Sequence, residues 1–437
     1  MRIRAFFAMF FITALIGLII PLRPKTSTLE KRDLEKWPTF SWESFTDGSY
    51  FSGISTWYAD TFPFREALIS LNQKFEGLYG FKGEQVVHNT MRTEDTAPKV
   101  EEKPVVEEPE EEPASQTAVG AKQGGGTIQA VPEQIGDIYV TGDTGFELFY
   151  FYQEGAEQYI NTITDIANRL AGISDVYVLS APNSVGVMLS EDAQKKMGIS
   201  LQTEAIDYIY AGLQERNDSI HCVNAYPNLA AHNDEYIYFR TDHHWTAKGA
   251  YYAYLAFCDE KGLTPHSLDD YTKMEFPGFL GTFYSGSNQA PSLAENPDTI
   301  EAYVPIATND MMFFGHDGIE YDWKVISDAT EWDTSAKYNC FIGSDEPYSE
   351  IENPTLTDGS SIVVVKESYG NAFVPFLVDH YQHVYIVDYR YFYMYPEYDN
   401  NLQRMIEEKG IQDVLFLNTT SVMMQPAKSE TIAGMFP

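Results

Sequence analysis

A carboxylate and an imidazole lie two residues apart in the stretch Asp-His-His-Trp at 242–245. A strand-like run at 235–240 precedes this stretch and a helical pattern at 246–261 follows it, so the pair sits on a strand-to-helix turn. A carboxylate in this position can fix the tautomer of the imidazole, whose other nitrogen then acts as a general base. We therefore predict that Asp242 orients His244 and that His244 is the base.

A serine follows a second strand pattern. The apolar run at 361–366 predicts a buried strand, and Ser368 comes two residues later, where a helix is expected to begin. Nucleophiles are found at such strand ends, and an N–H group at a helix start, with the amide of Asn371, could stabilise an oxyanion. We add Tyr369 as a candidate substrate contact. The alternative role for Ser368 is that of a helix N-cap, and only Asp242 and His244 favour the nucleophile.

The next strand pattern, at 383–387, is followed by Asp-Tyr-Arg-Tyr-Phe at 388–392. Because the carboxyl ends of parallel strands meet at one edge of a sheet, Arg390 and Tyr391 are expected near any substrate bound at Ser368. We interpret Arg390 as a positioning residue, with surface packing as its alternative.

The adjacent Asp242, His243 and His244 could instead hold a metal ion. No His-Glu-x-x-His or Cys-x-x-Cys pattern supports this, and the other histidines lack ligand spacing. The sequence also has no Walker A loop and no Gly-x-Gly-x-x-Gly motif. We predict no metal and no cofactor, with the metal alternative left to a chelator test and His243 left unassigned.

Strand patterns alternate with helical patterns from residue 136 onward. Continuously apolar strands of this kind predict a doubly wound, three-layer α/β fold with a mostly parallel sheet. The strands are expected at 175–181, 219–225, 361–366, 383–387 and 413–417, and the helices at 155–171, 202–215, 246–261 and 401–409.

An uninterrupted apolar run extends from Phe6 to Leu22 between basic residues. Its length and the lack of a small-x-small cleavage site favour an uncleaved signal-anchor within residues 1–25 over a cleaved signal or a buried helix. We expect a single-pass protein of the cell membrane whose catalytic body lies outside the cytoplasm.

The rest of the chain divides by composition. Residues 26–93 are expected to form a juxtamembrane segment that packs on the main domain, and 135–437 the catalytic domain. The stretch 94–134 between them is rich in Glu, Pro and Gly and predicts a disordered acidic linker. A net charge of −35 argues against nucleic acid as a partner, and three cysteines are too few for a disulfide framework.

Several motifs together resemble those of the bacterial DHHW proteins, which are similar to the alginate O-acetylation proteins AlgX and AlgJ. The resemblance rests on Asp-His-His-Trp at 242–245 and Lys-Glu-Ser-Tyr-Gly-Asn-Ala-Phe-Val-Pro-Phe at 366–376, and it extends to 60–65, 281–285 and 388–392. It implies an SGNH-hydrolase-like domain in which Asp242 orients, His244 is the base and Ser368 the nucleophile. Here Lys-Glu-Ser-Tyr replaces the usual Gly-Asp-Ser.

The resemblance further implies an O-acetyltransferase that acts on a cell-surface polysaccharide or a cell-wall glycan through an acyl-enzyme, with a membrane-bound O-acyltransferase as acetyl donor. Two alternatives remain. The same triad would serve a carbohydrate O-acetylesterase, in which water replaces the sugar. The chain could also be a non-catalytic envelope protein that binds glycan.

Overall fold

The computed structural model describes residues 26–27, 32–33, 36–46, 49–63, 85–87 and 137–437. The apolar run at 6–22 and the acidic stretch at 94–134 lie outside these residues. Among the helices that are described, none combines the length and the apolar character needed to cross a membrane.

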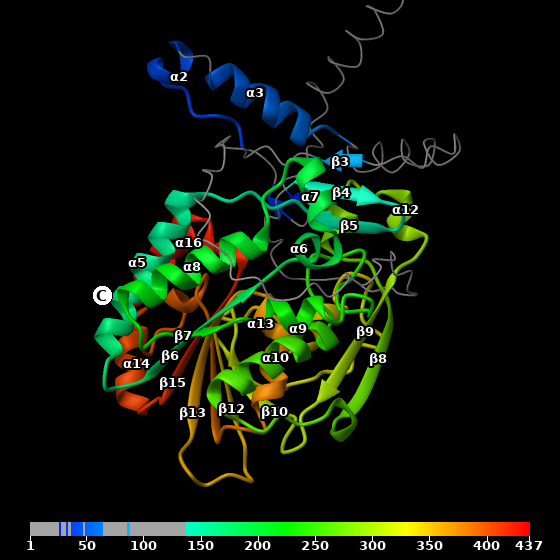
Figure 1. Cartoon of the computed structure of the whole chain (residues 1–437). Coiled ribbons are helices and arrows are strands. Elements are labelled where there is room, and N and C mark those ends of the chain that lie inside the picture. The colour runs from blue at the N-terminus through cyan, green and yellow to red at the C-terminus, as the bar shows by residue number, and fades with distance from the viewer. Residues whose placement is uncertain (1–25, 28–31, 34–35, 47–48, 64–84, 88–136) are drawn as a thin grey trace, which may run out of the picture.

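An eight-stranded mixed sheet forms the centre of the molecule (Figure 1). Its order is β11-β10-β12-β14-β13-β15-β6-β7. Five neighbouring strands are parallel, and these are β14 (His383–Asp388), β13 (Ser361–Lys366), β15 (Asp413–Thr419), β6 (Asp175–Ala181) and β7 (His221–Val223). The other three are antiparallel to their neighbours, and these are β12 (Tyr348–Glu352), β10 (Asp310–Phe314) and β11 (Glu320–Lys324). The expected parallel sheet therefore accounts for only part of the observed one.

Helices cover both faces of this sheet, which confirms the α/β class (Figure 1). Successive side chains of a strand point to opposite faces, so Val363 and Val364 of β13 enter two different cores, and both are fully buried. The core on the Val363 side includes α5 (Gln153–Leu170), α8 (Gln202–Arg216), α14 (Leu402–Lys409) and α16 (Pro426–Ala433). The core on the Val364 side includes α9 (Tyr226–Ala230), α10 (Ala247–Lys261) and α13 (Tyr369–Phe373).

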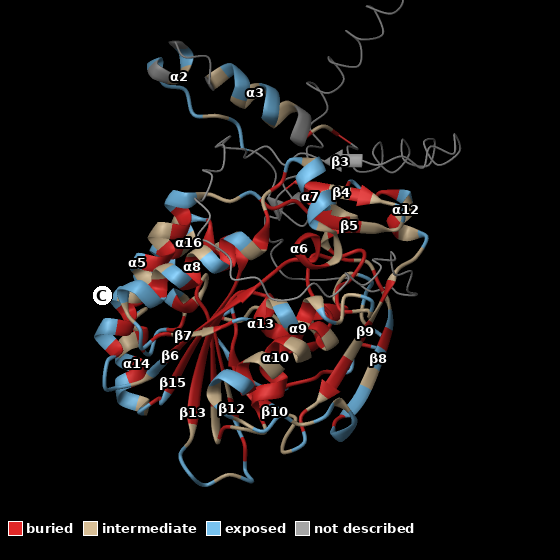
Figure 2. Ribbon diagram, viewed as in Figure 1, coloured by how far each residue is buried: buried red, intermediate tan, exposed pale blue. Residues whose placement is uncertain are grey.

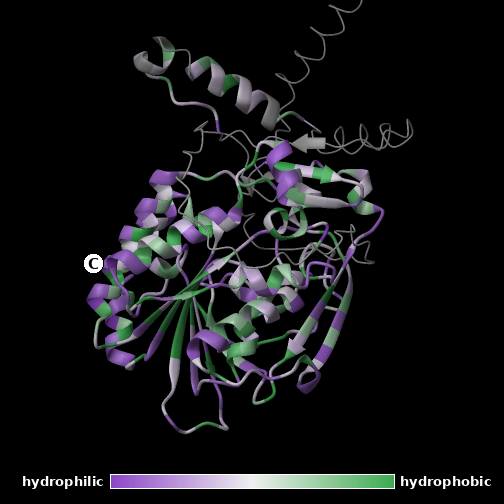
Figure 3. Ribbon diagram, viewed as in Figure 1, coloured by the Kyte–Doolittle hydropathy of each residue, from purple (hydrophilic) through white to green (hydrophobic). Residues whose placement is uncertain are grey.

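The burial and the hydropathy of the central strands agree. Figure 2 shows the inner strands as buried along almost their whole length, and Figure 3 shows that the same strands are apolar. A strand covered on both faces has no solvent side that polar residues could occupy, and this explains the continuous apolar runs in the sequence.

Smaller elements surround this core. A three-stranded sheet joins β3 (Gln85–Val87), β4 (Ile138–Thr141) and β5 (Thr144–Glu147), so part of the expected juxtamembrane segment pairs with the main body. Two-stranded sheets join β8 (Thr272–Phe279) to β9 (Asp298–Val304) and β1 (Thr26–Ser27) to β2 (Arg32–Asp33). The remaining α-helices are α2 (Trp42–Thr46), α3 (Ser49–Asp60), α6 (Ser184–Met188), α7 (Glu191–Met197), α11 (Thr282–Gly286), α12 (Pro291–Ala294) and α15 (Thr420–Met423). Four 3₁₀ turns are also described, and these are η1 (Leu268–Asp270), η2 (Lys337–Cys340), η3 (Val374–Leu377) and η4 (Phe392–Met394).

The helix that follows the Asp-His-His-Trp turn has a clear start and end. The Thr246 hydroxyl accepts a hydrogen bond from the Gly249 N–H at 3.2 Å and so caps the first turn of α10. At the other end Gly262 adopts a left-handed conformation with φ of 75°, which a side chain would disfavour. The observed helix agrees closely with the predicted one at 246–261.

The strand expected at 235–240 is wrong. Within this segment only Tyr238 makes a β-bridge, to Trp245. The neighbouring backbone groups bond to the same turn, from the Phe239 N–H to the His244 carbonyl at 3.2 Å and from the Thr246 N–H to the Ile237 carbonyl at 2.9 Å. A tight local hairpin therefore takes the hydrogen bonds that a sheet strand would have used.

A buried polar network secures the end of β13. The Glu367 carboxylate accepts hydrogen bonds from the Asn418 amide at 2.7 Å and from the Thr419 N–H at 2.6 Å. The Asn418 carbonyl oxygen accepts one from the Tyr159 hydroxyl at 2.9 Å. All of these residues are buried, so each bond lost leaves a polar group without its partner.

Asn418→Ala is therefore expected to lower the free energy of unfolding by about 2–4 kcal/mol, because it removes one hydrogen-bond donor from the buried Glu367 carboxylate and the acceptor of the Tyr159 hydroxyl. Urea denaturation of the full chain measures this change. Asn161→Ala, on the exposed side of α5, is the matched control and should change the value by less than about 0.5 kcal/mol. Equal effects of the two substitutions would contradict the role assigned to the network.

Candidate active site

The structure brings Asp242, His244 and Ser368 into one hydrogen-bonded line. His244 Nδ1 lies 2.5 Å from Asp242 Oδ1, and His244 Nε2 lies 2.6 Å from Ser368 Oγ. Asp242 and His244 belong to the turn before α10, whereas Ser368 lies between β13 and α13. All three side chains are buried. The arrangement has the geometry of a nucleophile, a base and an orienting carboxylate.

Asp242 is held as an anion. Its Oδ2 atom accepts hydrogen bonds from the Thr282 N–H at 2.8 Å and from the Thr282 hydroxyl at 2.9 Å, and Oδ1 also accepts the His244 N–H at 3.0 Å. Burial alone would raise the pKa of Asp242. The adjacent His244, with its charge and hydrogen bond, His243 and the Thr282 N–H outweigh burial and hold this pKa below its usual value.

The backbone passes close to Asp242 at Gly281. A Cβ atom at this position would lie 2.2 Å from Asp242 Oδ2, so only glycine fits there. Sequence reasoning did not assign Gly281 and Thr282 to the site. Their signal was the stretch at 281–285, which contributed to the family resemblance without a stated role.

An aromatic ring lies against the base. Tyr338, in η2, stacks on the His244 ring with 4.0 Å between centroids and 13° between planes. Its hydroxyl donates a hydrogen bond to the Ser368 carbonyl at 2.9 Å. Tyr338 therefore contacts both the base and the backbone of the candidate nucleophile. The sequence carried no signal for it, because this tyrosine lies in a segment without a recognisable motif.

Ser368 occupies the N-cap position of α13, yet its side chain makes no capping hydrogen bond. Its hydroxyl is directed to His244 instead. The following Tyr369 secures the turn that carries the base, since its hydroxyl bonds to the His243 carbonyl and its carbonyl accepts the Trp245 indole N–H at 2.9 Å. The N-cap role considered for Ser368 is therefore not the one that its side chain takes.

A compact charged cluster lies beyond Ser368, at the ends of β13 and β14. The buried Lys366 ammonium lies 3.1 Å from Asp388 and 3.2 Å from Asp345. Arg390 pairs with the same two carboxylates, at 2.6 Å and 3.1 Å respectively. Asn371 donates its amide to Asp345 at 2.9 Å. Arg390 and Asn371 thus lie at the predicted edge of the sheet, with these donor groups directed at protein carboxylates.

Tyr391 lies beside this cluster. Its ring makes an edge contact with His316, with 4.6 Å between centroids, and the Arg390 guanidinium lies 5.3 Å from the Tyr391 ring centroid. The substrate contacts predicted for Tyr369, Asn371, Arg390 and Tyr391 remain predictions.

The three groups considered as metal ligands are also close together. One ligand atom each of Asp242, His243 and His244 can be chosen so that all lie within 4.8 Å of one another. The same atoms already serve the hydrogen-bonded line, because His244 bonds to Asp242 through Nδ1 and to Ser368 through Nε2. His243 Nδ1 lies 2.6 Å from the Thr282 hydroxyl. A metal ion and the triad therefore compete for His244.

Several solved structures resemble this chain. A DHHW family protein from Eubacterium siraeum is 27% identical, with a TM-score of 0.60 over 69% of this chain and 95% of the other. PatB1 of Bacillus cereus, solved with a sulfonyl adduct, is 19% identical, with a TM-score of 0.55 over 65% of this chain and 95% of its own, which indicates a shared fold. The O-acetyltransferase domain of Pseudomonas putida AlgJ is 12% identical, with a TM-score of 0.37 over 67% and 96% of the two chains, and so slight a similarity supports no argument.

A comparison with curated protein sequences found no match. The family model described as DHHW protein matches residues 30–108 and 103–387, which is most of the chain. The match includes the Asp-His-His-Trp stretch at 242–245 and the serine at 368. The chain therefore belongs to the DHHW protein family.

Proposed function

We propose that the chain is an O-acetyltransferase that carries an acetyl group on Ser368 and passes it to a hydroxyl of a cell-surface polysaccharide or cell-wall glycan. The observation that supports this most strongly is the continuous line from Asp242 through His244 to Ser368, with contacts of 2.5 and 2.6 Å. A serine hydroxyl becomes a useful nucleophile when an oriented base can take its proton.

The first half-reaction loads the enzyme. Ser368 Oγ attacks the acetyl carbonyl of an ester donor while His244 Nε2 takes the hydroxyl proton, so a new ester bond forms at Oγ. The bond to the donor alcohol breaks, and His244 returns the proton to that alcohol as it leaves. Asp242, ionised and bound to Nδ1, stabilises the imidazolium in between.

The second half-reaction transfers the acetyl group from Ser368 to the acceptor. An acceptor hydroxyl gives its proton to His244 and attacks the acetyl carbon, and the ester bond to Ser368 breaks. Oγ then recovers the proton from His244. Water in place of the sugar would give an esterase with the same first half-reaction, so the acceptor distinguishes the two activities.

We also propose a cellular location, an acetyl donor and a class of acceptor for this enzyme. The apolar run at 6–22 would anchor the chain in the cell membrane and leave the body outside the cytoplasm. A membrane-bound O-acyltransferase would then supply the acetyl group. The net charge of −35 favours an uncharged or cationic acceptor over an anionic one.

Ser368→Ala should abolish the acetyl adduct that p-nitrophenyl acetate leaves on the full chain and should lower turnover by about 10³-fold or more, because the nucleophile is gone. Peptide mass spectrometry locates the adduct, and a sulfonyl fluoride is expected to label the same serine. Ser219→Ala, at an exposed serine before β7, is the control and should keep both adducts on Ser368.

Two results would contradict this assignment. One is an adduct that persists in Ser368→Ala with unchanged turnover. The other is activity that a chelator abolishes and that added zinc restores, which would favour a metal at Asp242, His243 and His244 over the triad.

A glycan acceptor should redirect the acetyl group. With oligosaccharides present, the full chain is expected to form acetylated sugar faster than free acetate, since the acceptor hydroxyl competes with water for the acetyl-enzyme. Chromatography of the labelled products from a radioactive acetyl ester measures both. Release of acetate alone with every oligosaccharide tested would instead indicate an esterase.

The loss of unfolding free energy caused by Asp242→Asn should depend on pH. The pKa of Asp242 is lower in the folded protein than its usual value of about 3.9, so its contribution to stability is present above about pH 4 and is lost as the pH falls through the folded pKa. The difference in unfolding free energy between wild type and Asp242→Asn should therefore shrink below about pH 4. Urea denaturation across pH tests this, and a difference that grows in acid would contradict it.

A further inference from the structure

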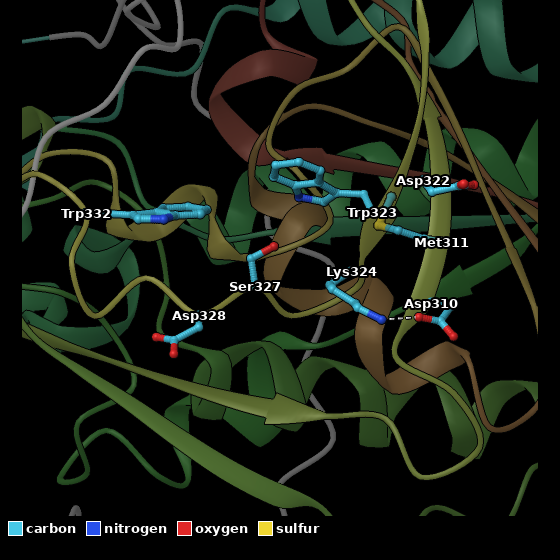
Figure 4. A pocket seen from close by; sticks show the side chains of 8 residues that line it. All are labelled: Asp310, Met311, Asp322, Trp323, Lys324, Ser327, Asp328 and Trp332. Carbon is cyan, nitrogen blue, oxygen red and sulfur yellow. Dashed lines mark hydrogen bonds and ion pairs between the residues drawn. The ribbon is translucent and has the colours of Figure 1, made fainter.

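A pocket of about 660 Å³ lies at the antiparallel edge of the sheet, outside the triad. It is formed by β10, β11 and the loop that follows β11 (Figure 4). Ligand pockets commonly have volumes of about 300–1,000 Å³ and combine aromatic walls with a few polar groups. The residues that line this one are Asp310, Met311, Asp322, Trp323, Lys324, Ser327, Asp328 and Trp332.

Two tryptophans give the pocket its walls. Trp323 is on β11 and is 38% exposed, and Trp332 is on the following loop. Figure 4 shows the two indole groups extending toward one another on either side of Ser327. Trp323 is supported from behind by an edge contact with Phe313, with 5.5 Å between ring centroids. Flat indole faces can pack against the C–H face of a sugar ring and so remove this apolar face from water.

The polar groups of the pocket suit hydroxyls and amines. Asp310 and Lys324 form an ion pair, and Asp328 adds a further carboxylate, whereas the Asp322 carboxylate points away from the two indoles (Figure 4). Two aspartates, Asp310 and Asp328, against Lys324 leave the lining negative. Carboxylates accept hydrogen bonds from hydroxyl or ammonium groups and repel other carboxylates. The pocket therefore favours an uncharged or amino sugar over a uronic acid.

The loop that carries Trp332 is fixed before any ligand arrives. The Asn309 side chain bonds to both backbone groups of Ile326, at 2.7 and 2.9 Å. The Asp328 carboxylate accepts the N–H and the hydroxyl of Thr330, at 2.9 and 2.6 Å. The buried Lys337 ammonium donates to the Thr330 carbonyl at 2.9 Å. A loop held in this way loses little conformational entropy on binding.

The same loop leads directly to the triad. Tyr338, which stacks on His244, follows Trp332 by six residues, so their Cα atoms are at most about 22 Å apart. The Thr334 carbonyl also accepts the Leu280 N–H at 3.1 Å, next to the segment that holds Asp242. The separation between Trp332 and Tyr338 is therefore one that a short glycan chain can span.

We propose that this pocket is a glycan-binding subsite, which seats an uncharged or amino-sugar unit of the acceptor between Trp323 and Trp332 while a different unit reacts at Ser368. The inference rests on the proposed function for the identity of the acceptor. Trp323 and Trp332 would hold the polymer at a unit away from the reacting hydroxyl.

Binding is measured on the full chain carrying Ser368→Ala, so that no turnover occurs. The probes are the pentamer of N-acetylglucosamine, its de-N-acetylated counterpart and a pentamer of a uronic acid, titrated by calorimetry. We expect the first two to bind and the third not to bind. Adding Trp323→Ala or Trp332→Ala should raise the Kd at least tenfold, whereas Trp42→Ala, at a 75% exposed tryptophan outside the pocket, should leave it unchanged.

A kinetic experiment distinguishes loss of glycan binding at this subsite from damage to the triad. In the otherwise wild-type chain, Trp332→Ala should raise the KM for the pentamer but leave the rate of acetyl adduct formation on Ser368 from p-nitrophenyl acetate unchanged. That unchanged rate also shows that the variant is folded, and Trp332→Phe should restore part of the binding because it keeps a ring.

Different results would contradict the glycan subsite and the transferase activity. If Ser368 acquires its adduct but neither tryptophan variant weakens binding, or if the uronic acid pentamer binds best, the subsite is overturned and the transferase stands. If the tryptophan variants lose binding while no adduct ever forms on Ser368, the subsite stands and the transferase is overturned.

Discussion

The contact between His244 Nε2 and Ser368 Oγ is the interaction on which the site depends, because it joins two segments that are 124 residues apart in the chain. Each segment is fixed by its own neighbours. The turn that carries His244 is anchored by the bonds of Asp242 to Thr282, and the serine follows the buried strand β13. Tyr338 then touches both partners and fixes their separation.

Burying so many polar groups at one edge of the sheet has a cost that only complete pairing offsets. Asp242 is surrounded by donors, Glu367 accepts two hydrogen bonds, and Lys366 lies between two carboxylates. In these networks Lys366 and Glu367 directly precede Ser368 in the chain, and Asp242 reaches it through His244. They position the serine rather than react themselves, and removing one member leaves its partners stranded in the interior.

The parts of this site that were predictable are those with a local signature. The strand at 361–366 and the helix after Thr246 follow from apolar patterning and capping, and the two ends of the hydrogen-bonded line follow from the Asp-His-His-Trp stretch and Ser368. The antiparallel pairing of β12 with β14 and the stacking of Tyr338 on His244 depend on contacts between distant segments, which no local pattern encodes. The segment at 235–240 has the aromatic and β-branched residues of a strand, but these residues occur equally well in the local hairpin that the structure shows.

We propose that Ser368 carries the acetyl group on the path of reaction. A single-turnover rapid-quench experiment on the full chain, with an acetyl ester and a glycan acceptor, follows the amount of acetyl-Ser368 over time. We expect the adduct to rise before acetylated sugar appears and to decay at the rate at which that sugar forms. Sugar that is acetylated before the adduct appears, or an adduct that decays more slowly than turnover, would contradict it.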